Sequence, residues 1–399
     1  MFNLAGFSSI DESCIEVRVG LKLLIVEALA TGLIKAPSSI LIEGFSMLRR
    51  FSTDAAKLNW IDVYIAVDKR IVADLPGSIL PCRRIYLEDP CIEDLLYWIG
   101  RLDFDKVYMI APETNGFLPA ILRRIVDEYG SSIIVNGSID RLNDIIDKLN
   151  LYHRLSEIDV KTPRSIDIGE ATLEDLDRLG YPLIVKPRLE AGCSGLRMVG
   201  DRREAEELLR DHDGCWIFQE YVKGLASSFS LVSDGCSLKL LSVNRQFVTL
   251  SHTGSSYLGG YVPLISPRIR VDELIDKLEA LLYGLKGYIG IDTVISGDEV
   301  YVIEVNPRLT VSYIGLSRSY KGNPAEAILE AALHGKLQEM DLFKGFSVFL
   351  KVKKAASSID MYVDDRVEAS IGGYSLISGF GYSLRDAWMD LIDVRGKLS

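Results

Sequence analysis

Two apolar runs, residues 288–295 and 301–308, flank the short polar turn Ser296-Gly-Asp-Glu299. Apolar runs of this composition on either side of such a turn predict a β-hairpin. Side chains alternate between the two faces of a strand, so Glu304 and Asn306 are expected to point to the same face. This part of the chain is therefore constrained to paired strands that carry polar groups between apolar neighbours.

Asp292 lies on the first strand of this hairpin, opposite the strand that carries Glu304 and Asn306. Two carboxylates and an amide oxygen on one face are hard ligands of the kind that Mg²⁺ prefers when nucleotide phosphates complete its shell. Arg308 follows two positions later and offers a forked cation to phosphate or carboxylate. The alternative is a hairpin with a solvated polar face. The apolar residues that flank each polar position disfavour it.

The bulk composition describes an ordinary globular chain of 399 residues, 48% apolar and 25% charged, long enough for two to four domains. The net charge is −11 and no basic stripe stands out, which argues against nucleic acid as a main partner. No apolar run reaches about 18 residues, so no membrane span is expected. Acidic residues at 11, 12 and 16 argue against a signal peptide.

The cysteines show no metal or disulfide pattern. Six cysteines are scattered without a CxxC pair, and the four histidines are scattered as well. This usage is typical of reduced structural thiols and predicts a cytoplasmic enzyme without a zinc site.

The first third of the chain alternates strand and helix patterns after a weakly patterned arm over residues 1–18. Helices are expected near 38–59, 91–102 and 117–129, and strands at 22–26, 60–67, 85–87, 105–111 and 132–135. The alternation predicts a doubly wound α/β domain, and such sheets bind ligands at the carboxyl ends of their strands. Glu113 follows one of these strands, so it is either a substrate contact or a helix cap.

The middle of the chain contains a lysine at the end of a buried strand. A helix is predicted at 139–150. Further along, Lys186 lies at the end of the run 181–187, and the small-residue loop Ala191-Gly-Cys-Ser-Gly195 follows that run. A buried lysine needs an anionic partner, and backbone N–H groups of such a loop can surround a phosphate. The alternative for the loop is an ordinary glycine turn. Neither a P-loop nor a GxGxxG sequence is present.

The strand predicted at 216–222 carries two adjacent polar residues, Gln219 and Glu220, within an apolar run. Such a strand can present backbone groups to the edge of an adenine while aliphatic side chains enclose the ring. The alternative is a linker strand with a solvated carboxylate. Beyond it, antiparallel strands and a helix at 271–285 lead to the hairpin. The last stretch, 345–399, mixes two or three strands with a helix near 384–392.

In this order the motifs resemble the ATP-grasp superfamily of carboxylate–amine and carboxylate–thiol ligases over residues 138–335. The resemblance implies a mixed α/β and α+β protein. Its parts would be a Rossmann-like pre-ATP-grasp domain (1–137), a two-subdomain ATP-grasp fold (138–340) and a small C-terminal α+β extension (341–399). It also implies two Mg²⁺ or Mn²⁺ ions at the hairpin and Arg308 at the transferred phosphoryl group. The implied ATP contacts are Lys148, Lys186, Gly192, Ser194, Gly195, Gln219, Glu220, Tyr221 and Val222, and the implied metal ligands are Asp292, Glu304 and Asn306.

One departure concerns the ribose. Many of these ligases place an acidic residue two positions after the glycine that follows the hinge strand, whereas here Gly224 is followed by Leu225-Ala-Ser227. Either the ribose is held differently or Glu220 holds it.

A narrower resemblance, over residues 22–335, is to the archaeal ATP-grasp group that includes tyramine–L-glutamate ligase. It rests on segments at 27–32, 43–48, 110–114, 242–246, 257–260 and 306–310. It implies L-glutamate as the acid and tyramine as the amine. Arg245 and Arg308 are the candidates for the unreacted carboxylate, although Arg245 also fits a surface charge. Tyr257 and a turn at Gly259-Gly260 are expected to border the slot for the aromatic amine.

The implied reaction is ADP-forming. A carboxylate takes the γ-phosphoryl group of ATP, and an amine then displaces phosphate to form an amide. Two alternatives remain at this stage. One is different chemistry on the same fold, such as a carboxylase, a thiol ligase or a kinase. The other is a nucleotide-binding regulatory protein without turnover. The expected partners are small molecules rather than nucleic acid or a membrane, and a monomer and a homo-oligomer both remain open.

Overall fold

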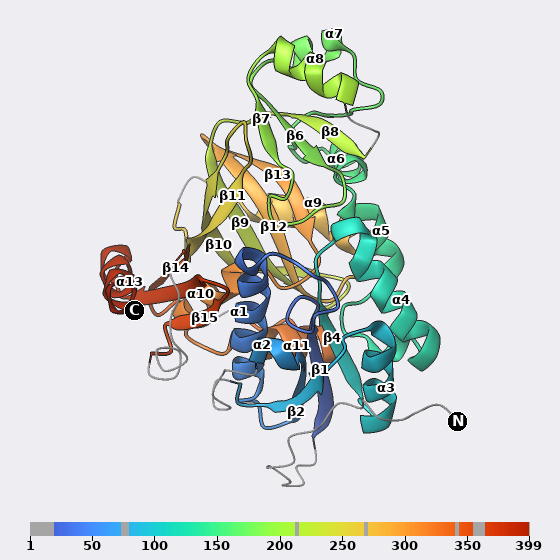
Figure 1. Ribbon diagram of the computed structural model, residues 1–399, viewed down its shortest axis with the longest axis vertical. Coiled ribbons are helices and arrows are strands. Elements are labelled where there is room, and N and C mark those ends of the chain that lie inside the picture. The colour runs from blue at the N-terminus through green and yellow to red at the C-terminus, as the bar shows by residue number, and fades with distance from the viewer. Residues whose placement is uncertain are drawn as a thin grey trace.

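The computed structural model describes residues 20–72, 80–211, 215–266, 270–339, 343–353 and 364–398. The arm expected over residues 1–18 lies outside them. The described chain forms three sheets, and Figure 1 shows a small lobe above a large sheet, with the first domain below. The mixed α/β and α+β class expected from the sequence is confirmed. No described helix combines the length and the apolar character that crossing a membrane requires.

The first domain is a four-stranded parallel sheet of order β3-β2-β1-β4. Buried aliphatic residues fill its strands, as expected for a sheet that is covered on both faces. Its strands are β1 (Leu21–Glu27), β2 (Ile61–Asp68), β3 (Arg83–Leu87) and β4 (Lys106–Ile110), and its helices are α1 (Ser38–Ala55), α2 (Lys69–Val72), α3 (Ile92–Leu102) and α4 (Phe117–Tyr129).

The strand predicted at 132–135 is wrong. A short 3-10 turn, Ser131–Ile133, occupies the segment, and a single bridge joins Ile134 to Val107. The side chain of Asn136 takes over the pairing further along. Its Oδ1 accepts the N–H of Met109 at 3.0 Å, and its Nδ2 donates to the Met109 carbonyl at 2.8 Å. A side-chain amide therefore satisfies the edge of β4 where a fifth strand was expected.

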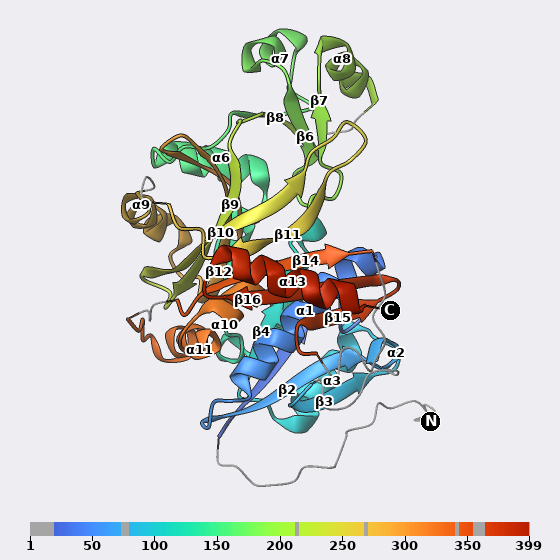
Figure 2. The same cartoon turned by 90° about the vertical axis from the view of Figure 1, so that its left-hand side faces the viewer.

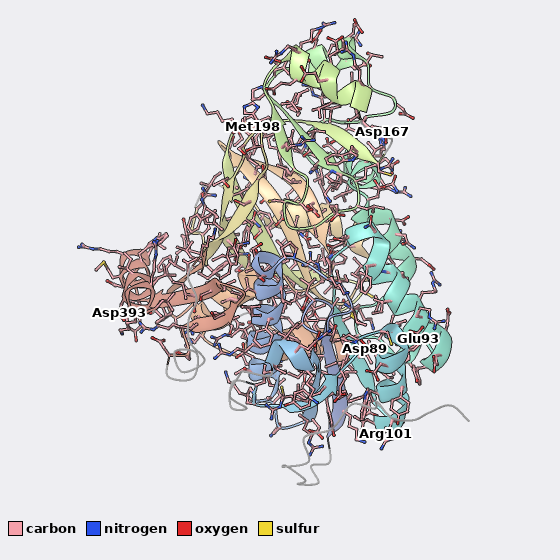
Figure 3. The ribbon with its side chains drawn as sticks, viewed as in Figure 1. Asp89, Glu93, Arg101, Asp167, Met198 and Asp393 are labelled. Atoms are coloured by element: carbon pink, nitrogen blue, oxygen red, sulfur yellow. The ribbon has the colours of Figure 1, made fainter. Side chains whose placement is uncertain are left out.

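The small lobe is a four-stranded antiparallel sheet of order β5-β8-β6-β7. Asp167 on β5 and Met198 on β7 mark its two edges in Figure 3. Its strands are β5 (Ser165–Asp167), β6 (Leu183–Pro187), β7 (Arg197–Val199) and β8 (Trp216–Glu220), and its helices are α7 (Leu173–Leu179) and α8 (Arg202–Asp211).

Two helices, α5 (Ile139–Ile146) and α6 (Lys148–Glu157), precede this lobe where a single helix, 139–150, was predicted. Asp147 divides them. It has an extended backbone, and its side chain accepts the N–H groups of Leu149 and Asn150 as the N-cap of α6. Lys148 is therefore the first residue of its helix.

The large sheet has eight strands in the order β13-β12-β9-β10-β11-β14-β16-β15. The expected hairpin is confirmed as β12 and β13. The strands are β9 (Leu225–Ser233), β10 (Leu238–Thr249), β11 (Ser256–Val262), β12 (Gly287–Ser296), β13 (Glu299–Asn306), β14 (Phe346–Val352), β15 (Val367–Ile371) and β16 (Tyr374–Gly381). The helices are α9 (Asp272–Leu282), α10 (Ser312–Ser319), α11 (Pro324–His334) and α13 (Leu384–Lys397).

The predicted turn at Gly259-Gly260 is wrong, because both residues lie inside β11. The glycines are needed there because neighbouring strands approach closely. A Cβ at Gly259 would lie 2.1 Å from the Phe349 carbonyl oxygen, and one at Gly260 would lie 2.1 Å from the Arg245 carbonyl oxygen.

The C-terminal strands continue this sheet. β14 pairs with β11, and Figure 2 shows α13 lying across β14 and β16. On the edge strand β15, the fully buried Glu368 forms ion pairs with Arg50 of α1 at 2.6 Å and with Arg318 of α10 at 2.9 Å. One buried carboxylate thus joins all three parts of the chain.

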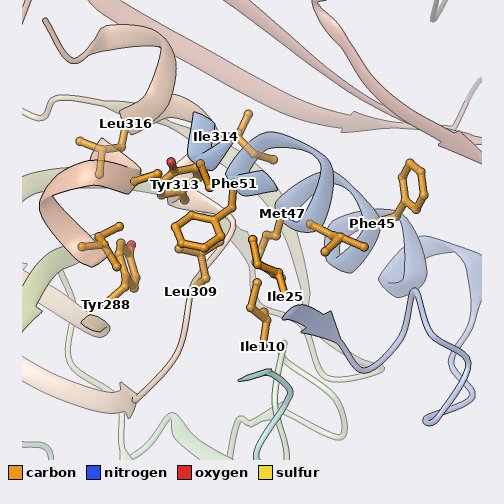
Figure 4. Packing of buried hydrophobic residues seen from close by; sticks show 14 of the residues in the cluster. Ile25, Phe45, Met47, Phe51, Ile110, Tyr288, Leu309, Tyr313, Ile314 and Leu316 are labelled. Carbon is orange, nitrogen blue, oxygen red and sulfur yellow. The ribbon is translucent and has the colours of Figure 1, made fainter. Parts of the chain in front are cut away.

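A shared apolar core holds the first domain against the large sheet (Figure 4). Phe51 of α1 packs edge-on against Tyr313 of α10, with ring centroids 5.4 Å apart. The hydroxyl of Tyr313 donates to Asp54 at 3.0 Å, which satisfies both buried polar groups. This packing fixes the first domain next to the end of β13.

Candidate functional site

A cavity of about 520 Å³ lies between the small sheet and the large sheet. Its walls come from β6, β7 and β8 on one side and from β10 to β13 on the other, and α1 contributes Glu43. Apart from Gly195, every residue predicted to contact ATP or a metal ion lines it, as do Arg245 and Arg308. These residues are Lys148, Lys186, Gly192, Ser194, Gln219, Glu220, Tyr221, Val222, Arg245, Asp292, Glu304, Asn306 and Arg308.

Asp292 and Glu304 are directly paired across the hairpin. Asp292 accepts hydrogen bonds from Gln246 at 2.7 Å and from Asn306 at 3.2 Å. Burial, together with the charge of Glu304, raises the pKa of Asp292 to about 6. Two carboxylates that repel each other in a buried site are stabilised by a cation, and the donor set of carboxylate and amide oxygens suits Mg²⁺. The residues therefore fit the predicted metal site.

Lys148 lies next to this pair. Its ammonium group is 3.2 Å from Glu304 and donates to the Glu190 carbonyl at 2.5 Å, and the residue is only 6% exposed. The preceding residue, Asp147, forms an ion pair with Arg188 at 2.8 Å, which ties the start of α6 to the end of β6. The lysine is thus fixed at the edge of this carboxylate pair.

Lys186 is 3% exposed and makes no hydrogen bond or ion pair within the described parts of the chain. Burial and the nearby charge of Lys148 lower its pKa to about 8, against the opposing effect of Glu304 and Asp292. A buried ammonium group facing a cavity without a partner is costly. An anion such as a phosphate would remove that cost.

The loop after β6 follows the cavity wall with left-handed backbone at Gly192 (φ 67°), Cys193 (φ 64°) and Gly195 (φ 72°). Gly195 is outside the cavity lining because it packs against Pro187 and Trp216. The loop also touches the first domain, since Asn115 donates its N–H to the Leu189 carbonyl at 2.9 Å. Glycine has no Cβ and adopts this backbone without strain, which lets the loop turn beside the cavity at Gly192 and Gly195.

The side chains of Gln219 and Glu220 have structural partners. Gln219 donates to Ser165 at 2.9 Å, and Glu220 forms an ion pair with Arg164 at 2.9 Å. After Glu220 the chain leaves β8, so Tyr221 and Val222 lie outside the strand ladder while lining the cavity. Their backbone remains the candidate for adenine contact. Glu220 would have to leave Arg164 to hold a ribose.

Arg308 is held by a residue of the first domain. Its Nε and Nη2 donate to the two oxygens of Glu113 at 3.0 and 2.8 Å, and Nη2 is also 3.3 Å from the Asn306 side-chain oxygen. Glu113 is 1% exposed, lies outside the cavity lining and caps no helix with its side chain. The side chain therefore does not act as the predicted helix cap, and its carboxylate is committed to Arg308, which it orients.

Arg245 borders the cavity but points elsewhere. It is the strand neighbour of Gln246, which bonds Asp292, so its side chain lies on the opposite face of β10. There the guanidinium lies 5.7 Å above the Phe247 ring and donates to the carbonyls of Ala226 and Gln246. The predicted role of Arg245 as a substrate anchor lacks geometric support for this reason.

The sequence interpretation missed Gln246 and Glu43. Gln246 orients Asp292, and Glu43 lines the cavity from α1. Gln246 has no distinctive local pattern. Glu43 does, because it is a single carboxylate in an otherwise apolar turn of the helix, Ile40-Leu-Ile-Glu-Gly-Phe45.

Comparison with known proteins adds the following. Residues 145–312 match the family model described as an ATP-grasp domain. The carbamoyl phosphate synthase large chain of Clostridium beijerinckii is 24% identical over 323 residues, or 76% of this chain, and the chain spans only 29% of the length of that relative.

Two further relatives are similar. The tyramine–L-glutamate ligase of Methanocaldococcus fervens is 24% identical over 221 residues, which cover 43% of this chain and 74% of the relative. The crystal structure of an ATP-grasp superfamily protein from Archaeoglobus fulgidus aligns with a TM-score of 0.65 at 23% identity. The alignment covers 90% of this chain and 99% of the other, and it shows the fold.

Proposed function

This chain carries an ATP-grasp domain, and on that basis we propose that it is an ADP-forming ligase that joins a carboxylate to an amine. We also propose the division 1–137, 138–340 and 341–399, with the last part completing the large sheet. A homo-oligomer is compatible with this function and is not required by it.

The observation that carries the proposal is that side chains of opposite charge line the same cavity. Asp292 and Glu304 place two half-buried carboxylates opposite each other, a pair that a cation stabilises, and the buried ammonium group of Lys186 needs an anion. Mg-ATP satisfies both at once. Asp292, Glu304 and Asn306 would hold two Mg²⁺ or Mn²⁺ ions, which neutralise phosphate charge when bound. A regulatory module without turnover has no need for the paired carboxylates.

The reaction we propose has two steps. In the first, an oxygen of the substrate carboxylate attacks the γ-phosphorus of ATP, the bond from that phosphorus to the β,γ-bridging oxygen breaks, and ADP leaves. In the second, the amine nitrogen attacks the carbonyl carbon of the acyl phosphate, inorganic phosphate leaves and the nitrogen loses a proton. Lys148, Lys186 and Arg308 offset the developing charge from fixed positions. The loop at 191–195 shields the acyl phosphate from water.

The acid and the amine are proposed as L-glutamate and tyramine. The support is the similarity to the tyramine–L-glutamate ligase of Methanocaldococcus fervens, which covers 43% of this chain. Tyr257 and Ser312 line the cavity beyond Asp292 and offer hydroxyl groups for a polar substituent. Arg308, which lines the same cavity, is the cation that we propose for a substrate carboxylate.

Release of ADP from Mg-ATP tests the proposal when candidate acids and amines are added singly and in pairs. We expect release that requires both substrates and an amide product whose mass equals the sum of the two minus water. Release with bicarbonate in place of the acid would assign a carboxylase, and release with a thiol in place of the amine would assign a thiol ligase. Phosphoryl transfer to an alcohol in place of the acid would assign a kinase. ATP binding without ADP release under every combination would refute a ligase.

A further inference from the structure

Glu43 is a buried carboxylate that faces the cavity and is only 8% exposed. One of its oxygens, Oε1, accepts from the ammonium group of Lys351 at 2.5 Å. Lys351 lies on β14, and its ammonium group also donates to the Ser39 carbonyl at 3.0 Å, so two acceptors hold it in place. The second oxygen of Glu43 has no hydrogen-bond partner among the residues that the structure describes.

Glu43, Tyr257, Arg308 and Ser312 line the same cavity as Asp292 and Glu304, and these four residues are named the Glu43 chamber. The hydroxyl of Tyr257 is hydrogen-bonded to Ser312. The chamber thus offers one cation, one anion and the hydroxyl groups of Tyr257 and Ser312.

Each of these two charged side chains is held by an ion-pair partner. Glu113 orients Arg308, Lys351 orients Glu43, and neither partner lines the cavity. A residue needed only to balance a buried charge would have no reason to keep an oxygen open to the cavity. The open oxygen of Glu43 can accept a hydrogen bond from a molecule that enters.

The surroundings of the open Glu43 oxygen favour one class of hydrogen-bond donor. A guanidinium group is recognised best by both oxygens of a carboxylate, and here one of them is taken by Lys351. A divalent cation needs several oxygen ligands, and only one oxygen of the Glu43 carboxylate is open. A compact ammonium group needs only one oxygen and hydroxyl neighbours, which this chamber provides.

We propose that Glu43 binds the cationic amino group of a substrate of this enzyme. The inference rests on the proposed ligase function and narrows its substrates to those with a free ammonium group. The group belongs either to an amino acid that is activated at its carboxylate or to the amine before it loses its proton. The chemistry recognised is the same in both cases.

The test compares wild type with Glu43→Gln, which keeps the shape and removes the charge. ADP release is measured with L-amino acids and with the matching acids that lack the amino group, such as L-glutamate against glutarate, using hydroxylamine as a neutral nucleophile. We expect the KM of the preferred amino acid to rise about 10- to 100-fold, the range of a charge-assisted hydrogen bond. The KM of ATP should stay within about twofold, and the preference for the amino-bearing acid should disappear.

A second arm locates the ammonium group. With the acid saturating, a rise in the KM of tyramine alone would assign Glu43 to the amine, and a rise in the KM of the acid alone would assign it to the acid. If neither KM changes by more than about twofold in a folded Glu43→Gln enzyme, the inference is overturned. Asp127→Asn, at an exposed carboxylate on α4, controls for the loss of one negative charge.

Calorimetry separates this inference from the ligase function. Amino acids and tyramine are titrated into protein that holds Mg²⁺ and a non-hydrolysable ATP analogue. Binding to wild type that is lost in Glu43→Gln would support the inference even if no turnover is found. No binding of any ammonium ligand to wild type would overturn it. If Glu43→Gln does not fold, Glu43→Asp keeps the charge on a shorter arm and should show the same KM rise to a smaller extent.

Discussion

Arg308 and Glu113 are 195 residues apart in the chain and form a two-pronged ion pair at 2.8 and 3.0 Å. The pair joins the loop after β4 of the first domain to the residue that follows the metal hairpin. Both side chains are nearly buried, at 12% and 1% exposure. The large sheet therefore receives the orientation of Arg308 from a residue that follows the first sheet.

Glu113→Gln should reduce both stability and turnover. The neutral amide leaves the Arg308 guanidinium buried without a counter-charge, a loss on the order of 3 kcal/mol in unfolding free energy. A misoriented Arg308 should lower kcat by about 10- to 100-fold. Denaturant unfolding and ADP release measure the two effects. Glu113→Asp, which keeps the charge, should recover part of both, and unchanged kcat in Glu113→Gln would contradict the orienting role.

Glu304→Gln should nearly abolish phosphoryl transfer and leave the fold intact. The variant removes one of the two carboxylates that we assign to the metal ions and one partner of Lys148. Glu299→Gln on the same strand is the matched control, since Glu299 lies at the surface and pairs with Lys161. ADP release at ordinary Mg²⁺ concentration measures the effect. Wild-type turnover in Glu304→Gln would remove Glu304 from the metal site.

Lys186→Met should change ATP affinity and stability in opposite directions. ATP binding should weaken by about 1.5–3 kcal/mol, the value of a hydrogen bond to a charged group. The free protein should become more stable at pH 7, because the wild type must bury an ammonium group whose pKa falls to about 8. That cost fades as the pH rises from 8 toward 10.5, so the gain should fade as well.

Calorimetry with ATP and denaturant unfolding without it measure the two quantities for Lys186→Met. Lys277→Met on α9, at a lysine with surface ion pairs, is the control and should change neither. Unchanged ATP affinity in Lys186→Met would exclude a phosphate contact.

Glu27→Gln should stabilise the protein above neutral pH. Burial raises the pKa of Glu27 from its ordinary 4.5 to about 7, against the opposing N–H of Ala30, which lies 2.7 Å from the carboxylate. The wild type therefore loses stability as the pH rises from 4.5 to 7, by an amount on the order of 3 kcal/mol. The amide has no charge to bury. Unfolding free energies of the two proteins should agree near pH 4.5 and diverge by pH 8, and parallel pH profiles would refute the assignment.

Glu368→Gln should destabilise the chain by about 3–5 kcal/mol at pH 7, because it breaks a buried ion-pair network. Burial by itself would raise the pKa of Glu368, but Arg50, Arg318 and Arg49 lower it to about 2. A lowered pKa stabilises the fold above pH 4.5, and that stability is lost as the pH falls toward 2. Denaturant unfolding from pH 7 to pH 3 should show this loss in wild type and not in the variant.

The sequence by itself determined the local parts of this protein. Apolar runs of strand length located β1, β2 and β4, and the turn at 296–299 located the hairpin with Asp292, Glu304 and Asn306. These features are local because side-chain alternation along a strand and the chemistry of a turn depend on a few neighbouring residues. The lysine at the end of a buried strand was recognisable for the same reason.

The tertiary structure alone decided which distant residues meet. Glu113 meets Arg308 and Glu43 meets Lys351 across separations of 195 and 308 residues, and no local pattern records such contacts. In the structure, Arg245 also points away from the carboxylates, and the side chain of Asn136 pairs with β4 where a strand was predicted. Strand register and domain packing set these outcomes, because they decide which face and which partner each side chain receives.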